Sequence, residues 1–344
     1  MFEVALDVHK DFTVIDVCDP TVEKKNQHRM VTVPTTREGL ESVLVPLKGQ
    51  CRVAFEVCLQ AQWVASIVRP LAAEVQVANP SRIPWLFRDG RKNDQLDARK
   101  LVTLLHMNQL PLVHLPRAEV SLWRSLINSR RTQIKRRTMI KNQLRSILRA
   151  VALCCPHRSL WTNRGLEWLR SLQMEEIRQG MVRRLMRELA FLEADIADQE
   201  KELDQIAEKQ LAVAQLKTIP GIGPRCAEAI VAYADDIRRF GRGRQFASYF
   251  GMTPTQDASG LVNRHGHISK RGPTVVRWVL IEAAHQVIRH CKAAQAFCDR
   301  IWHGKRGCYK KAIVATGRKL LTVMFAMLRD GTDFNPERLI QPAA

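Results

Sequence analysis

The stretch Gly90-Arg91-Lys92-Asn93-Asp94-Gln95-Leu96-Asp97-Ala98-Arg99-Lys100 organises the N-terminal part of this chain. Asp94 and Asp97 stand three residues apart at the start of a predicted helix, Gln95 to Met107, so both carboxylates project from one face and can share a cation. The basic residues that crowd them favour a metal site that meets phosphate. The alternative is an ordinary helix N-terminus, in which Asp94 is the cap and Asp97 interacts with the helix dipole.

The residues before this stretch predict an α/β domain. Phe2 to Val8 alternates between apolar side chains and the series Glu3, Ala5 and Asp7, which is typical of a strand with two different faces. Two further β-rich runs, Asp11–Cys18 and Met30–Pro34, complete a predicted antiparallel meander. The remaining predicted elements are a helix capped by Thr36, a strand over Cys51–Val57 with Val53, Phe55 and Val57 inward, a helix over Ala61–Leu71 and a strand over Glu74–Ala78. Three strands, helix, strand, helix, strand and helix is the order of a ribonuclease H-like fold, which we expect over residues 1–110.

In such a fold the first and fourth strands are neighbours, and the last helix packs beside them. The acidic residues that would converge there are Asp7, Glu56, Asp94 and Asp97. Four carboxylates at one point repel one another unless they are neutralised, so we expect them to bind divalent cations. Two Mg²⁺ ions would suit phosphoryl transfer, because one can activate the attacking oxygen while the other stabilises the leaving oxygen. Asp11 and Asp16 are alternatives to Asp7, which is favoured because a charge inside a short apolar strand needs a partner.

A long basic helix is predicted over Arg117–Ala150, after the break at Pro111 and Pro116. Its only acidic residue is Glu119, and a helix so unbalanced in charge would repel itself without a polyanion. The residues expected to contact nucleic acid are Arg130, Arg131, Lys135, Arg136, Arg137 and Lys141. The whole chain of 344 residues carries a formal net charge of +20, which also points to a polyanionic partner.

A predicted heptad seam follows the basic helix. Its apolar positions are Leu185, Leu189, Leu192, Ile196, Leu203 and Ile206, with Gln199 as a polar seam position and Val213 extending the register past Gln210. The seam could fold back onto the basic helix or pair two chains, and its narrow, regular spacing favours the second arrangement. Residues 111–215 are therefore predicted to form a basic helix and a coiled coil.

Residues 216–335 are predicted to form a mostly α-helical C-terminal domain. Pro220-Gly221-Ile222-Gly223 opens it, and this turn before a helix would present backbone N–H groups of Gly221 and Gly223 to a phosphate, as in helix-hairpin-helix DNA-binding proteins. Glycines in a bare turn would look the same. Helices over Thr274–His290 and Lys311–Leu328 are expected to complete the domain.

A polar loop, Asp257-Ala258-Ser259-Gly260, is predicted inside this C-terminal domain. Ser259 is either a turn residue or a nucleophile toward a phosphodiester, in which case nearby cations and metal ions would assist it rather than a Ser-His-Asp triad. The basic residues that follow the loop and could contact nucleic acid are Arg264, Lys270 and Arg271.

Over nearly its full length the chain resembles the DEDD transposases of the insertion-sequence one-ten family, which are bridge-RNA-guided recombinases. Leu6-Asp7-Val8 matches the family's first Asp motif, Phe55-Glu56 matches its Glu motif, and Asp94 to Arg99 matches its Asp-x-x-Asp-Ala-Arg motif. Pro220 to Gly223 and the block from Ser259 to Gly272 match its C-terminal domain. The motifs are specific as a set.

The resemblance implies a RuvC-like N-terminal domain, a coiled-coil middle and a C-terminal transposase domain. It implies that Ser259 attacks a DNA phosphate to form a covalent phosphoserine link, with Mg²⁺ on the four carboxylates and no need for ATP. The implied partners are donor and target DNA, a bridge RNA that pairs with both, and further copies of the chain in a dimer or tetramer. One departure follows Glu56, where Val57-Cys58-Leu59-Gln60 replaces the family's small residue, Thr-Gly and aromatic residue.

Two other functions stay open from the sequence. A RuvC-like structure-specific endonuclease would hydrolyse DNA with the four carboxylates and leave Ser259 unused. A non-catalytic architectural DNA-binding protein would use the acidic cluster only structurally. The sequence shows neither a signal peptide nor an apolar run of about 20 residues, so we expect a cytoplasmic protein with no membrane partner.

Overall fold

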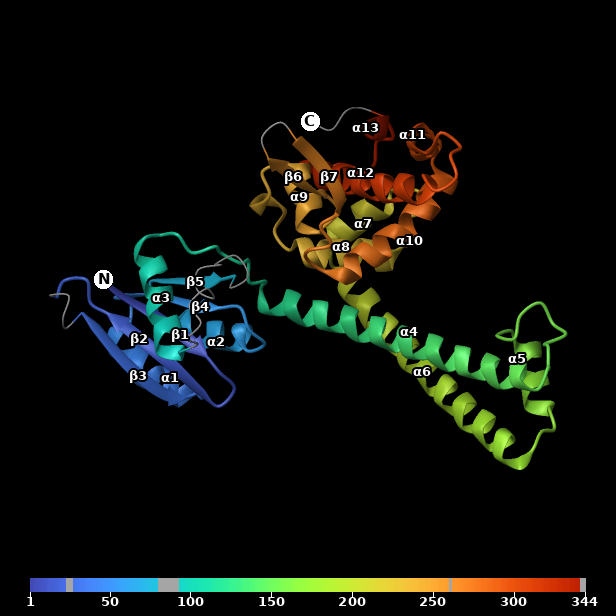
Figure 1. The fold of residues 1–344 in the computed structure, drawn as a ribbon, viewed down its shortest axis with the longest axis horizontal. Helices are drawn as coiled ribbons and strands as arrows, with labels where there is room; N and C mark the ends of the chain where they lie inside the picture. Colours follow the sequence, from blue (N-terminus) through green and yellow to red (C-terminus); the bar gives the residue numbers. More distant parts are fainter. Residues whose placement is uncertain (23–26, 80–92, 260–261, 341–344) are drawn as a thin grey trace. The chain divides into compact units, whose positions relative to one another are not determined.

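The computed structural model describes residues 1–22, 27–79, 93–259 and 262–340. The chain divides into two compact units, Met1–Ala118 and Glu119–Ala344. The first unit is mixed α/β and contains a five-stranded sheet, whereas the second is mostly helical (Figure 1). At this level the predicted fold class is confirmed. Among the described residues, no helix is both long and apolar enough to cross a bilayer.

The sheet of the first unit has the strand order β3-β2-β1-β4-β5. Its strands are β1 (Phe2–Val8), β2 (Phe12–Cys18), β3 (His28–Pro34), β4 (Cys51–Glu56) and β5 (Glu74–Ala78). The first three form the predicted antiparallel meander, while β4 runs parallel to β1 and β5 runs parallel to β4. The prediction that Val57 faces inward is wrong: the chain leaves the sheet after Glu56, and Val57 is 40% exposed.

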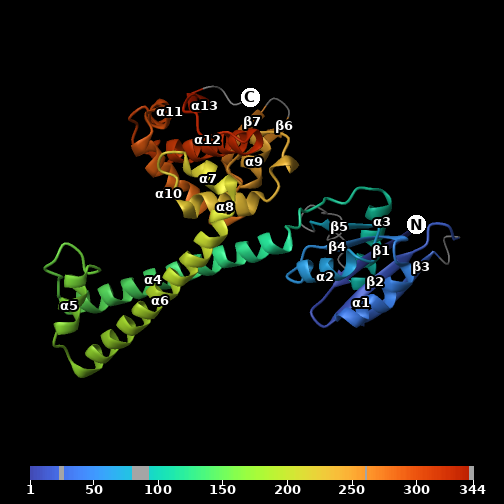
Figure 2. The same cartoon turned by 180° about the vertical axis from the view of Figure 1, so that it is seen from behind.

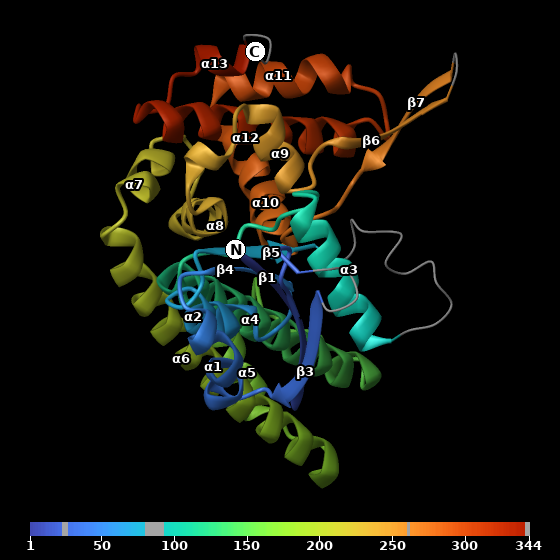
Figure 3. The same cartoon turned by 90° about the vertical axis from the view of Figure 1, so that its left-hand side faces the viewer.

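Helices cover both faces of this sheet (Figure 3). On one face, α1 (Arg37–Leu44) and α2 (Ala61–Val68) pack against Val4 and Leu6, and a 3-10 turn at Val45–Leu47 follows α1. On the other face, α3 (Asp94–His106) packs over Ala5 and Ala54, whose small side chains let the helix approach the sheet. Asp7 and Glu56 follow these alanines with the period of two that a strand imposes, so both belong to the α3 face.

The predicted helix cap at Thr36 is confirmed, because its hydroxyl accepts a hydrogen bond from the backbone N–H of Gly39 at 3.1 Å. The cap at the start of α3 is different from the one we considered. Asn93 is the cap, and its side-chain oxygen accepts a hydrogen bond from the N–H of Gln95 at 3.0 Å. The Asp94 side chain is therefore not used for capping, and it lies in the first turn of the helix.

Two long helices, α4 (Ala118–Ala150) and α6 (Glu176–Glu208), run side by side in the second unit, with α5 (Asn163–Ser171) between them in sequence (Figures 1 and 2). Residues of the seam pack inside this chain: Leu189 and Leu192 of α6 share a buried cluster with Ile140 and Leu144 of α4. Our preference for a seam that pairs two chains is therefore corrected. The sequence pattern of a heptad is the same for an intrachain and an interchain partner, so spacing alone did not distinguish them.

The predicted register also does not continue to Val213. Helix α6 ends at Glu208, Gln210 is extended, and a separate helix, α7 (Leu211–Lys217), begins after it. Val213 is buried in the core of the helical unit instead of lying on the seam. The extended backbone at Gln210 changes the direction of the chain, which ends any helical periodicity.

The remaining helices surround one apolar core. They are α8 (Pro224–Ala234), the 3-10 helix η4 (Ile237–Arg239), α9 (Gly243–Tyr249), α10 (Thr274–His290), α11 (Lys292–Trp302), α12 (Tyr309–Asp330) and α13 (Glu337–Ile340). The helix predicted at Thr274–His290 is confirmed, and α12 contains the other predicted helix. The aromatic side chains of Phe246 and Tyr249 each pack edge to face against Phe250.

The segment that we predicted as a polar loop forms a hairpin. Its strands are β6 (Pro254–Ser259) and β7 (Val262–Ile268), which pair antiparallel with Ser259 opposite Val262. Figure 3 shows the hairpin extending from the helices of its unit. Thr255 and Gln256 are exposed, so this strand lacks the apolar face that would reveal it in the sequence. Gly260 of the predicted Ser-Gly motif lies outside the described residues.

Candidate active site

Asp7 and Glu56 lie at the same level of two adjacent strands. Leu6 of β1 pairs in parallel with Phe55 of β4, so the next residue on each strand, Asp7 and Glu56, faces α3 at the end of the sheet. Both strands end within one residue of these carboxylates. The first and fourth strands are thus adjacent, as predicted.

Helix α3 adds Asp94 and Asp97 at the same end of the sheet. Both residues lie in its first turn, and the helix packs on β1 and β2. Asp97 forms an ion pair with Lys100, one turn further along the helix, at 3.7 Å. Asp94 and Asp97 lie close enough to add to the rise in the pKa of Asp7, and Asp97 adds to that of Glu56.

His9 connects two of these carboxylates, and sequence reasoning missed it. Its Nε2 lies 3.2 Å from a carboxylate oxygen of Asp7 and 3.4 Å from one of Asp94. One candidate ligand atom from each of these three residues lies within 4.8 Å of the other two. The signal available in the sequence was its position, because His9 follows Asp7 by two residues, just past the end of β1.

The electrostatics of the cluster are those of crowded, partly buried acids. Burial raises the pKa of Asp7, His9 opposes this rise, and the charges of Asp94 and Asp97 add to it. Burial also raises the pKa of Glu56, with further contributions from Asp7 and Asp97. A divalent cation would relieve this repulsion, and carboxylate oxygens are the ligands that hard divalent cations prefer. The residues present therefore fit a divalent metal site.

The alternative ligand Asp16 has a different partner. It is fully buried on β2, and one of its oxygens lies 2.9 Å from Nδ1 of His28. Asp11, the other alternative, is exposed in the turn before β2. Asp7 is therefore the acid on the first hairpin that lies with Asp94 and His9.

The basic residues of α4 divide into two groups. Arg130 forms an ion pair with Glu200 of α6, and Lys141 lies 3.0 Å from Glu193 of the same helix. Arg131 donates a hydrogen bond to the Thr274 hydroxyl at 2.8 Å. The exposed members of the predicted set are Lys135 and Arg136, and Arg137 is half-buried. The first group helps to join α4 to its neighbours, whereas the second presents positive charge to solvent.

The two glycines before α8 differ in environment. Gly221 has φ of +93°, and a Cβ atom there would lie 2.7 Å from backbone atoms of Gln286 and Val287 in α10. Gly223 caps α8 with φ of −86° and is exposed, and a Cβ atom there would have no described atom within 4 Å beyond its chain neighbours. Gly221 is thus required for helix packing, while Gly223 faces open space where a phosphate could approach.

Ser259 is the last residue of β6, next to the hairpin tip. Arg264 on β7 and both Lys270 and Arg271 after it are exposed.

Arg277 of α10, which the sequence did not reveal, binds the backbone next to the base of this hairpin. Its guanidinium donates hydrogen bonds to the backbone carbonyls of Phe250, Arg271 and Gly272 at 3.2, 2.7 and 3.0 Å.

Comparison with known families agrees with this arrangement of an acidic cluster and a helical unit. A family model for DEDD transposases of the IS110 type, described as "Transposase", matches residues 4–152. A second model, described as "Transposase IS116/IS110/IS902 family", matches residues 213–299. The class of protein is therefore a transposase whose N-terminal unit carries a cluster of acidic residues.

Individual relatives point the same way. The chain is 30% identical over 292 residues to a probable family 20 transposase of Pseudomonas aeruginosa, covering 83% of this chain and 86% of that protein. It is 27% identical over 297 residues to the transposase for insertion sequence element IS1111A of Coxiella burnetii, covering 83% and 80%. It is also 31% identical over 122 residues to the pilin gene-inverting protein of Moraxella lacunata, covering 35% and 38%. The chain belongs to the IS110 family of DEDD transposases.

Proposed function

We propose that this transposase cuts and rejoins DNA through a covalent phosphoserine intermediate, with Ser259 as the nucleophile. The proposed metal ligands are Asp7, Glu56, Asp94 and Asp97, and the proposed cofactor is a pair of Mg²⁺ ions. The observation that carries the metal centre is the cluster itself: acids from β1, β4 and α3 lie together, and ligand atoms of Asp7, His9 and Asp94 lie within 4.8 Å of one another. Burial raises the pKa of Asp7 and Glu56, and the neighbouring carboxylates add to this rise. Family membership supports the DNA substrate.

We also propose that the first unit is RuvC-like. Its sheet order, its parallel β4 and β5 strands and the position of α3 follow the order expected for a ribonuclease H-like fold. The division of the rest of the chain into a middle region, 111–215, and a C-terminal transposase domain, 216–335, stays a prediction.

The chain's own groups have distinct roles in this proposal. The four carboxylates hold the cations, and His9 keeps Asp7 and Asp94 in place through its contacts with both. Bound cations would polarise the scissile phosphate and stabilise the leaving oxygen. The Ser259 oxygen forms a bond to phosphorus while the bond from phosphorus to a DNA oxygen breaks and releases a DNA hydroxyl. A hydroxyl of another strand later displaces Ser259, so one phosphoester replaces another at each step and ATP is not needed.

Nucleic-acid contacts in the proposal come from exposed basic residues. On α4 these are Lys135 and Arg136, and around the hairpin they are Arg264, Lys270 and Arg271. A bridge RNA that selects donor and target DNA by base pairing is part of the proposal, as are assembly into a dimer or tetramer and action in the cytoplasm. The relative whose name denotes the inversion of a pilin gene supports rejoining over simple hydrolysis.

One gel tests the reaction. Purified protein is incubated with the DNA that flanks its gene, the candidate RNA and Mg²⁺, then denatured and examined for protein covalently joined to DNA. We expect an adduct that is absent with Ser259→Ala and retained with the matched control Ser269→Ala. Asp94→Ala should also remove it, because the metal centre is incomplete. Nicked DNA without an adduct from both the wild type and Ser259→Ala would contradict the proposal and favour the hydrolytic endonuclease.

A further inference from the structure

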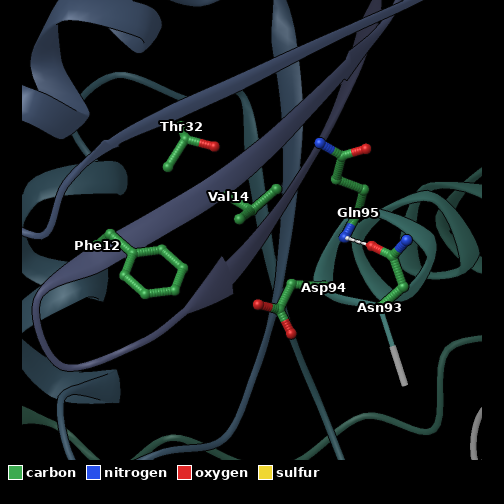
Figure 4. Close-up of a pocket in the computed structure, with 6 residues that line it drawn as sticks. All are labelled: Phe12, Val14, Thr32, Asn93, Asp94 and Gln95. Carbon is green, nitrogen blue, oxygen red and sulfur yellow. Dashed lines mark hydrogen bonds between the residues drawn. The ribbon is translucent and has the colours of Figure 1, made fainter. Parts of the chain in front are cut away.

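We propose that an open pocket beside the carboxylates binds a nucleobase of a single polynucleotide strand whose phosphate lies at the metal centre. The pocket has a volume of about 510 Å³ and is lined by Phe12, Val14, Thr32, Asn93, Asp94 and Gln95 (Figure 4). This volume is within the range of small-molecule binding sites. The inference rests on the proposed function, which it extends by a site for the substrate's base.

The walls of the pocket suit a flat ring with polar edges. Phe12 and Val14 lie two residues apart on β2, so both face the pocket, and Thr32 pairs with Val14 across the sheet. Phe12 is 41% exposed, so its ring is accessible to a ligand in the pocket. Asn93 and Gln95 place amide groups on the opposite side (Figure 4). A nucleobase has apolar faces for the ring and hydrogen-bonding edges for the amides.

The charge of the pocket favours a base over a phosphate. Among its lining residues Asp94 is the charged one, and its charge is negative. An anion would therefore be repelled from the pocket itself, whereas a neutral base would not. The Asn93 side-chain oxygen already accepts the N–H of Gln95, which leaves its amide N–H₂ group as the hydrogen-bond donor that it can offer a ligand.

Phe12 also links the pocket to the carboxylates. Its ring lies against the ring of His9, with 4.6 Å between the centroids and 30° between the planes. His9 in turn contacts Asp7 and Asp94. A base stacked on Phe12 would therefore place its own phosphate beside the cluster. Stacking on an aromatic ring tolerates every base, so the site would position a strand without reading its sequence.

Photochemical cross-linking tests the inference without requiring catalysis. The full-length Ser259→Ala protein, which cannot form the proposed adduct, is mixed in Mg²⁺ with single-stranded DNA that contains 5-iodouracil, irradiated and digested for mass spectrometry. We expect a cross-link at Phe12, and about a fivefold loss of affinity for this DNA with Phe12→Leu, the lower end of the range for loss of one stacked base. Phe12→Tyr, which keeps an aromatic ring, should retain both. An identical RNA probe shows whether the base comes from DNA or from a guide.

The matched control is Trp63→Leu, because Trp63 is another exposed aromatic residue of the first unit, 37% exposed, and lies outside the pocket. Equal affinity and an unchanged cross-linking pattern with Phe12→Leu would overturn the inference, as would an equal loss with Trp63→Leu. The proposed function is tested by a separate result. If Phe12 cross-links but no adduct depends on Ser259, the base-binding pocket is supported and the assignment of Ser259 as nucleophile is wrong. If the adduct depends on Ser259 while Phe12→Leu binds normally, the reaction stands and the pocket is wrong.

Discussion

Asp7→Asn should stabilise the protein in the absence of metal, although it removes a residue of the proposed metal centre. Burial raises the pKa of Asp7 above its ordinary value of 3.8, so the native state holds the proton more tightly than the unfolded state. The resulting penalty is absent below pH 4 or so, grows as pH rises through the raised native pKa, and is complete at neutral pH. Asn keeps the shape and cannot ionise.

The size of this effect follows from the geometry. Ligand atoms of Asp7 and Asp94 lie within 4.8 Å, and two unit charges at that separation repel by about 3 kcal/mol at an effective dielectric constant of about 20. The Asp94 side chain is 36% exposed, so solvent screening reduces this to about 1 kcal/mol. With Mg²⁺ at a hundred times its Kd, the wild type gains about 2.7 kcal/mol and the variant loses most of that gain.

Thermal unfolding with and without Mg²⁺ measures both effects. At pH 7 in EDTA, Asp7→Asn should unfold a few degrees above the wild type, roughly 3 to 5 °C. With saturating Mg²⁺ the order should reverse, because only the wild type gains the binding energy. Asp11→Asn, an exposed acid on the same hairpin, is the matched control and should change neither value. A variant that is less stable than the wild type in EDTA, or that gains the same stability from Mg²⁺, would refute the reasoning.

The helical unit supports three further predictions. Arg277→Met should speed amide hydrogen exchange in the β6–β7 hairpin and cost about 1 to 2 kcal/mol of stability, because the three carbonyls lose the Nη1 donor that they share; exchange unchanged relative to Arg289→Met would contradict this. Glu228 is buried in α8, which raises its pKa to about 7. Stability should therefore fall as pH rises from about 5 to 8, by up to about 3 kcal/mol, and Glu228→Gln should abolish that slope in urea titrations. Gly221→Ala should cost more than about 3 kcal/mol, since it combines a positive φ with a backbone clash, whereas Gly223→Ala should stay within about 0.5 kcal/mol in the same titrations.

Much of the first unit could be predicted because its physical signals are local. Alternation in β1 assigns Leu6 to one face and Asp7 to the other. Thr36 caps its helix by accepting a hydrogen bond from Gly39, which is only three residues further along the chain. The convergence of Asp7 and Glu56 then follows from the order of the strands. These features depend on short-range patterns that any related fold must satisfy.

The features that sequence reasoning missed depend on long-range contacts. His9 lies just past the end of β1, and nothing near it in sequence shows that Asp94 approaches from α3. The hairpin at residues 254–268 is polar on both faces, so it lacks the period of a half-buried strand. The partner of the heptad seam depends on whether α6 meets α4 of its own chain, and spacing is identical in either case.

The ion pairs between α4 and α6 have a consequence for how strongly binding to a polyanion depends on salt. Each phosphate neutralised by a lysine or arginine releases condensed counterions, and affinity falls with salt in proportion to their number. Arg130 and Lys141 already face the carboxylates of Glu200 and Glu193, so they replace few counterions when a nucleic acid arrives. In the proposed contact with nucleic acid, the salt dependence of α4 is therefore set by its outward residues, such as Lys135 and Arg136, and is weaker than the number of cationic side chains on the helix suggests.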